Sequence, residues 1–192
     1  MFKLLLVTLC LSSSVFAEAT AEKAATVAPV FQKAGYQFVG LNLGAEKPVG
    51  KERHQTPIRL SYGLEYSYAV MDQFSVGVVA TRSDAAASRG SSVDLSLLQV
   101  GVKAAYNPTY DSIVSLTAGK LFYEYSATSG GFTSSYKPDS DPFFIAPGLG
   151  LILPLAANIQ MIPNISYSFV MKNDDVDSFQ IFDAGVSFRY QF

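Results

Sequence analysis

The sequence has a single cysteine and little charge. Cys10 lies in the first seventeen residues, and charged residues make up only 16% of the 192-residue chain, against about 25% in ordinary soluble domains. If that first segment is removed, the remaining chain has no disulfide, thiolate or zinc-finger chemistry. Lys and Arg number 14 against 16 Asp and Glu, so no basic excess indicates a nucleic-acid partner.

The first seventeen residues have the pattern of a secretory signal peptide. The segment MFKLLLVTLCLSSSVFA contains a cation at Lys3, an apolar run from Leu4 to Leu11 and a small-residue cleavage site ending at Ala17. The apolar run is too short to span about 30 Å of hydrocarbon, so we do not expect a membrane anchor here. Cleavage removes one Lys and no acid, which leaves a net charge of 13 − 16 = −3.

The sequence is rich in apolar and aromatic side chains, and they alternate with polar or small ones. In residues 58–68, IRLSYGLEYSY, every second side chain is apolar or aromatic, a period that is typical of a β-strand with two unlike faces. About eight segments show this period. Residues 142–171 carry no charge, but Pro147, Pro154 and Pro163 exclude a membrane-spanning helix there.

Two of the eight segments are less regular than the others. In residues 112–125 the alternation changes phase near Gly119, which predicts a β-bulge. With that bulge, Leu121 and Tyr123 stay on the apolar face that begins with Val114. In residues 143–153 nearly every side chain is apolar, so the pattern does not indicate which ones point to which side.

The connections between the segments alternate in length. Short turns at 69–73, 107–111 and 154–158 alternate with longer polar loops, which are expected at 45–57, 82–94, 126–142 and 172–178. Strands of about 9–11 residues suffice to cross a bilayer. The pattern predicts an all-β fold, an eight-stranded antiparallel up-and-down transmembrane β-barrel.

Alternation alone does not decide whether the apolar face meets lipid or the core of a soluble, lipocalin-like barrel. Three features favour a barrel whose apolar face points outward and contacts lipid. The polar face carries few charges, although a water-facing surface would carry many. Aromatic side chains recur near the short turns, where an interfacial girdle belongs. The final strand would leave a hazardous apolar edge in water unless it pairs with the first.

The end of the chain resembles the C-terminal assembly signal of bacterial outer-membrane proteins. The residues that carry this resemblance are Val186, Phe188, Tyr190 and Phe192. With the strand count, residues 35–192 resemble the small eight-stranded barrels of the OmpA-like, OmpX-like and OmpW-like group. The resemblance implies a location in the outer membrane of the Gram-negative cell envelope. It also implies contact with outer-membrane lipid and lipopolysaccharide, and recognition by the barrel-assembly machinery.

The predicted organisation is therefore a signal peptide at 1–17, a periplasmic lead-in at 18–35 and the barrel at 36–192. We expect the barrel to be a monomer. Its leading function is a structural or surface-interaction role, with the lumen filled by polar side chains. The alternative is a narrow, porin-like channel for small or apolar solutes, and the third possibility is a lipid-modifying outer-membrane enzyme.

A polar network is predicted inside the barrel, because an eight-stranded barrel encloses a space that side chains just fill. A buried charge without a partner is costly, so Glu65 is expected to bridge to Arg189 or Lys103. The residues predicted to line the lumen are Arg59, Glu65, Lys103, Lys120, Glu124, Asp183 and Arg189.

Nothing in the sequence indicates catalysis or a cofactor. A hydrolase or acyltransferase would need a histidine with a serine and a carboxylate, and the single histidine, His54, lies among charged residues of a predicted loop. The acidic loop residues Asp174, Asp175 and Asp177 lack the spacing of a calcium-binding loop. We therefore expect no enzyme activity, no metal site and no cofactor.

Overall fold

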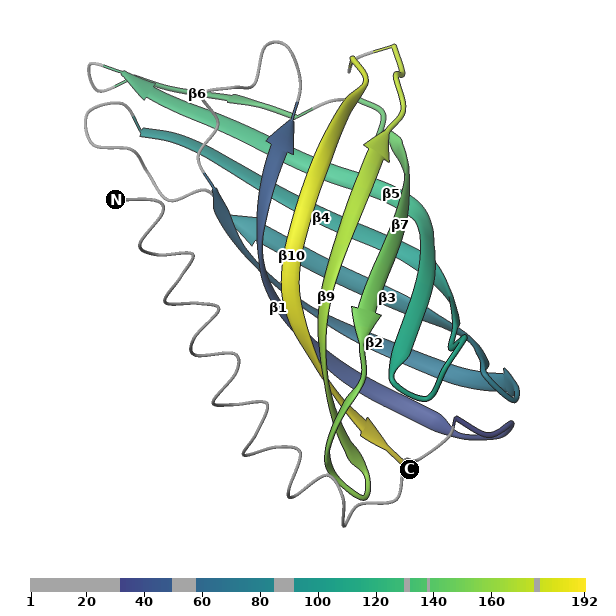
Figure 1. Cartoon of the computed structure of the whole chain (residues 1–192). Coiled ribbons are helices and arrows are strands. Elements are labelled where there is room, and N and C mark those ends of the chain that lie inside the picture. The colour runs from purple at the N-terminus through teal and green to yellow at the C-terminus, as the bar shows by residue number, and fades with distance from the viewer. Residues whose placement is uncertain (1–31, 50–57, 85–91, 130–131, 138, 175–176) are drawn as a thin grey trace.

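The protein is a closed antiparallel β-barrel with eight strands in its wall, as seen in a computed structural model (Figure 1). The structure describes residues 32–49, 58–84, 92–129, 132–137, 139–174 and 177–192. Its strand segments are β1 (Gln37–Val49), β2 (Arg59–Met71), β3 (Phe74–Asp84), β4 (Ser92–Tyr106), β5 (Ser112–Ser129), β6 (Phe132–Tyr136), β7 (Phe143–Leu151), β8 (Leu153–Ala156), β9 (Ile159–Val170) and β10 (Phe179–Gln191).

Eight strands follow from these ten segments because two of them are not separate wall strands. β7 and β8 are two parts of one strand, interrupted at Ile152, and both pair with β9. β6 pairs with the last five residues of β5 and adds no strand to the wall. The predicted eight-stranded up-and-down barrel is confirmed.

The barrel closes where its first and last strands meet. β1 and β10 pair antiparallel over twelve positions, from Phe38 with Gln191 to Val49 with Gln180. Two further backbone hydrogen bonds join Gln37 and Phe192. The final strand therefore has no free edge along this pairing, as the sequence predicted.

The strands are tilted relative to the barrel axis, as the register around the wall indicates. A row of directly paired residues starts at Arg189 and returns to β10 at Phe179, ten positions away. The row runs through Arg189, Gly40, Glu65, Val79, Gly101, Gly119, Phe144, Val170 and Phe179. A stagger of this kind fixes the strand tilt, which is about 35–45° in such barrels.

The apolar face of each strand lies outside and the polar or small face lies inside. On β2, Leu60 and Leu64 are 77% and 62% exposed, whereas Arg59 and Glu65 are 1% and 3% exposed. The C-terminal strand follows the same rule, with Phe188 and Tyr190 outside and Ser187 and Arg189 inside. The side chains therefore alternate between the two faces as expected, with the apolar ones on the outer wall.

The bulge predicted in the fifth strand is absent. β5 pairs continuously with β4 from Val114 to Thr128, without a register shift at Gly119. Consequently Leu121 is fully buried inside the barrel and Phe122 lies on the outer wall. The prediction that Leu121 and Tyr123 face outward is wrong, because the alternation keeps its phase and the interior at this level is itself apolar.

The orientation of the seventh strand, which the sequence left open, is settled by burial. Phe144 and Ala146 point inward, and Phe143 and Leu149 point outward. The β7–β9 ladder is interrupted near Pro147, since no pair joins residues 146–147 to β9. Proline supplies no backbone N–H to a ladder.

Below the barrel, residues 32–36 lie against the turn between β2 and β3. Gly35 donates to the carbonyl of Ala69 at 2.8 Å, and the amide of Gln73 donates to Gln32 at 3.1 Å. We call the end with this turn the short-turn end, and the opposite end the long-loop end. The predicted signal peptide (1–17), most of the lead-in and His54 lie outside the described residues.

No helix in the described ranges is long and apolar enough to cross a membrane.

Candidate functional site in the barrel interior

A carboxylate near the short-turn end holds two cations. Glu65 on β2 accepts a hydrogen bond from Nε of Arg189 at 2.5 Å and another from Nζ of Lys103 at 2.7 Å. The guanidinium of Arg189 also lies 6.0 Å from the centre of the Phe38 ring. Such a buried arrangement persists only when each charge is paired, so these residues form one unit with a net charge of +1.

Glycine makes this unit possible. Gly40 on β1 pairs with Glu65 on one side and with Arg189 on the other. A Cβ at Gly40 would lie 2.7 Å from Cγ of Glu65 and 3.4 Å from Cγ of Arg189. The absence of a side chain therefore lets Glu65 cross over β1 to reach a cation two strands away.

A second charged unit lies nearer the long-loop end. Oε1 of Glu46 lies 3.9 Å from Nη1 of Arg59, and Ser83 donates a hydrogen bond to Glu46. Asp183, which pairs with Glu46 across the β1–β10 seam, accepts a hydrogen bond from Ser61 at 2.9 Å. The two carboxylates and the guanidinium of Arg59 together give this unit a net charge of −1.

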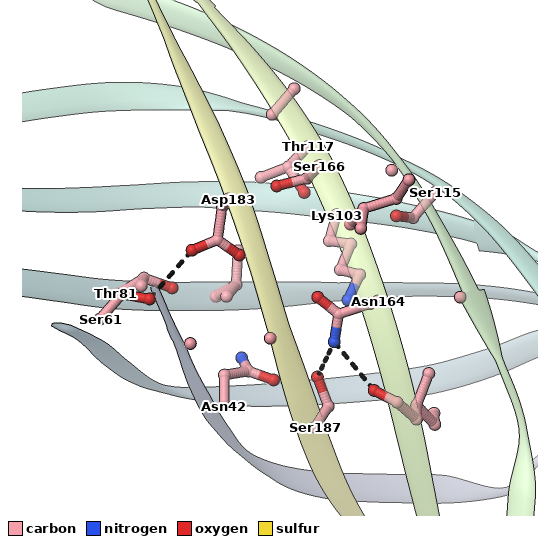
Figure 2. A pocket seen from close by; sticks show the side chains of 18 of the residues that line it. Asn42, Ser61, Thr81, Lys103, Ser115, Thr117, Asn164, Ser166, Asp183 and Ser187 are labelled. Carbon is pink, nitrogen blue, oxygen red and sulfur yellow. Dashed lines mark hydrogen bonds between the residues drawn. The ribbon is translucent and has the colours of Figure 1, made fainter. Parts of the chain in front are cut away.

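Between the two units lies a cavity of about 110 Å³ (Figure 2). Lys103 and Arg189 line it from the first unit, and Glu46 and Asp183 from the second. Most of the remaining polar lining is uncharged, namely Asn42, Ser61, Thr81, Gln99, Ser115, Thr117, Asn164, Ser166, Ser168 and Ser187. The cavity is therefore lined by both polar and apolar groups, with opposite charges on two parts of its wall.

Two apolar clusters pack inside the barrel above and below this cavity. Toward the short-turn end the cluster is Ala105, Ile113, Ile152 and Ile162. Toward the long-loop end it is Leu97, Leu121, Phe144, Ala146, Val170, Phe179 and Ile181, with Tyr123 against it. We call these two clusters the packed layers and the space between them the chamber.

Five of the seven residues predicted to line the lumen lie inside the barrel: Arg59, Glu65, Lys103, Asp183 and Arg189. Lys120 and Glu124 do not, because both are exposed on the outer wall near the long-loop end of β5. Their placement in the lumen depended on the bulge at Gly119, which the strand lacks.

Glu46 belongs to the interior but was not predicted there. The sequence reading ended the first strand before Ala45, whereas β1 continues to Val49. The alternation that sets Asn42 and Gly44 inward reaches Glu46 two residues later, and this continuation was the signal that could have identified it.

The residues of the predicted assembly signal lie on the outer side of β10. Phe188, Tyr190 and Phe192 are exposed by 38%, 50% and 57%, and the ring of Tyr190 stacks on that of Phe192 at 6.3 Å. Among the residues that the structure describes, no group of three or more His, Cys, Asp or Glu is placed to hold a metal ion.

Comparison with solved structures identifies the same fold in outer-membrane proteins. The attachment invasion locus protein Ail of Yersinia pestis has a TM-score of 0.60 and 14% identity, over 83% of this chain and 99% of that one. Neisserial surface protein A gives 0.60 and 14%, over 82% and 99%. A major outer-membrane protein of Thermus thermophilus gives 0.53 and 10%, over 83% and 100%.

These likenesses show that the chain has the fold of the small outer-membrane barrels. A scan against protein-family models finds no match, and a search of curated proteins finds none.

Proposed function

We propose that the protein is an integral outer-membrane β-barrel with a structural or surface-interaction role. The observation that carries this proposal is the outer wall. Large apolar side chains are exposed on each of the eight wall strands, for example Leu43, Leu64, Val78, Val102, Leu116, Leu149, Ile165 and Phe188. Monomeric soluble proteins rarely expose contiguous apolar patches of more than a few hundred Å², whereas lipid favours such a wall.

The packed interior supports a structural role more than a transport role. The Glu65 unit and the two apolar clusters occupy the barrel at successive levels. An eight-stranded barrel has room for little besides its own side chains. Ail, whose name refers to attachment and invasion, and Neisserial surface protein A have the same fold, which is a reason to test surface binding.

The proposed surroundings follow from the outer wall as well. Charged side chains lie outside toward the long-loop end, including Arg82 paired with Asp84 at 3.1 Å, Lys120 and Glu124. In an outer membrane this level would meet the phosphate-bearing part of lipopolysaccharide. The outward face of β10, with Phe188, Tyr190 and Phe192, would be recognised by the barrel-assembly machinery after export by a cleaved signal peptide.

Solubility tests the proposal directly. The chain without residues 1–17 is expected to fold only in detergent micelles or lipid vesicles, because the apolar outer wall needs an apolar solvent. Folding is measured by circular dichroism and by the faster migration of the unheated protein in gel electrophoresis. A folded monomer in buffer without detergent, established by ultracentrifugation, would contradict the proposal.

A narrow channel is the second candidate, and the chamber is the observation that favours it. The packed layers lie on both sides of this chamber, and the Glu65 unit lies at its short-turn end. Planar-bilayer recordings on the wild type and on Glu65→Ala test the idea. The structural role predicts no conductance in the wild type, and steady single-channel currents there would favour the channel.

A further inference from the structure

We infer that the interior chamber is a binding site for one small zwitterion, a molecule with a carboxylate at one end and an ammonium group at the other. This inference concerns binding inside the barrel and does not require a channel. It starts from the division of charge along the lumen.

The charges of the described lumen side chains sum to zero, but the excess positive and the excess negative charge lie at different levels of the barrel. Glu65 bonds both Lys103 and Arg189, so the unit near the short-turn end carries one excess positive charge. The unit near the long-loop end contains Glu46, Asp183 and Arg59, so it carries one excess negative charge. Electrostatic interactions inside such a low-dielectric site are much stronger than in water.

The excess charges lie on the wall of one cavity. Asp183 lies six residues from Arg189 on β10, on the long-loop side. Strands rise about 3.3 Å per residue, so the Cα atoms of Asp183 and Arg189 are about 20 Å apart along β10. Lys103 and Asp183 nevertheless both line the same chamber, because their side chains extend into it (Figure 2).

Each end of the chamber has hydrogen-bonding capacity of the matching kind. Nζ of Lys103 can donate three hydrogen bonds, and Glu65 accepts one of them. Oδ2 of Asp183 accepts from Ser61, and the second carboxylate oxygen can accept more. Oδ1 of Asn42, also on the lining, is buried without a hydrogen-bond partner.

Space beside these groups is kept open by glycine. A Cβ at Gly44 would lie 2.8 Å from Oγ of Ser61 and 3.2 Å from Oδ2 of Asp183. A side chain there would occupy the approach to the carboxylate. The hydroxyl and amide groups along the rest of the lining can satisfy the middle of a short polar ligand.

A zwitterion matches this arrangement better than either of its halves. Its carboxylate would lie toward Lys103 and its ammonium group toward Asp183, and each contact would be a charge-assisted hydrogen bond. An anion alone would leave the negative end unmatched, and a cation alone would leave the positive end unmatched. Neutral water could fill the chamber but would compensate neither charge.

Equilibrium dialysis with a series of ω-amino acids tests the inference. Because packed layers lie on both sides of the chamber, the wild-type chain is folded from urea into detergent micelles with the ligand present. The probes are glycine, β-alanine and 4-aminobutyrate, with acetate and methylamine as the separate halves. We expect saturable binding of one molecule per barrel, at least about tenfold tighter for one of the zwitterions than for either half.

Matched variants locate the site. Lys103→Gln and Asp183→Asn each remove one excess charge, and each is expected to weaken binding by about tenfold or more. Lys120→Gln and Glu124→Gln make the same chemical changes on the outer wall and should leave binding unchanged. Folding of every variant is checked by gel mobility before dialysis.

Two results would overturn the inference. One is that no zwitterion binds the wild type better than acetate and methylamine do, which needs no variant. The other is that the outer-wall variants lose as much affinity as the lumen variants. Both are distinct from failure of the proposed function, which would appear as folding without detergent.

Discussion

Glu65 is the residue on which the interior charge balance depends most. Glu65 is 3% exposed, and its carboxylate bonds two cations from different strands. Removal of its charge would leave Arg189 and Lys103 close together with no anion between them. The loss of one partner from a buried ion pair is costly because the remaining charge stays desolvated.

We therefore predict that Glu65→Gln lowers the free energy of unfolding by about 3–5 kcal/mol. The measurement is reversible urea unfolding of the protein in lipid vesicles. Glu124→Gln, on the exposed outer wall of β5, is the control and should change stability by less than about 0.5 kcal/mol. Equal midpoints for the two variants would mean that the Glu65 unit contributes no net stability.

At this scale the sequence predicted the faces of most side chains well. The alternation on β2 and β10 places Glu65 and Arg189 inside, and their pairing follows from the cost of burying charge. The prediction of side-chain direction failed where the lumen itself is lined by apolar side chains. Leu121 could not be assigned by polarity, because at the long-loop end both sides of the wall carry large apolar side chains.

Among the strands, β5 shows how unbroken alternation divides side chains between the inside and the outside of the barrel. It runs from Ser112 to Ser129 and pairs continuously with β4 from Val114 to Thr128. Leu116 lies on the outer wall, 50% exposed, and Leu121 lies in the interior cluster, fully buried. An odd separation of five residues puts them on opposite faces, as the period of two requires.

This difference predicts unequal effects for the same substitution. Leu121→Ala leaves a void among Leu97, Phe144 and Ile181, which should lower the free energy of unfolding by about 2–5 kcal/mol. Leu116→Ala leaves no void, because lipid fills the space, and should cost about 1–2 kcal/mol. Urea unfolding in vesicles measures both. Similar losses would instead support the bulge that would turn both side chains outward.

The strand ends were harder to predict than the strands. β1 continues to Val49, beyond the point where the sequence becomes charged and loop-like at Glu46 and Lys47. The barrel tolerates Glu46 because Arg59 lies opposite it on β2 and Ser83 of β3 donates a hydrogen bond to it. Such partners come from distant parts of the chain, so local composition could not reveal them.

Closure of the barrel determines the shape of the whole molecule. The sequence predicted that the barrel closes, but it did not predict the register at which the strands pair. An alternating, charge-poor chain with short and long connections favours an up-and-down barrel, because closure leaves no strand edge unpaired in lipid. The stagger of ten residues around the wall was not predictable. It results from the sum of every strand pairing, and it decides which lumen side chains share a level.

The chamber is a property of this same scale. Its lining comes from every strand of the wall, and its opposite charges are contributed by residues that are distant in sequence. The sequence predicted Asp183 and Lys103 as interior residues, but it could not show that a cavity lies between the two charged units to which they belong. That space depends on the stagger and on glycines such as Gly44.

The junction of Gln37 with Phe192 has a consequence of its own. The two residues exchange backbone hydrogen bonds of 3.3 and 3.1 Å, so the polypeptide completes one circuit and arrives beside its own starting strand. From the outside, this seam is held together like the others around the wall. The surrounding lipid therefore contacts the same kind of hydrogen-bonded wall at the β1–β10 seam as between the other neighbouring strands.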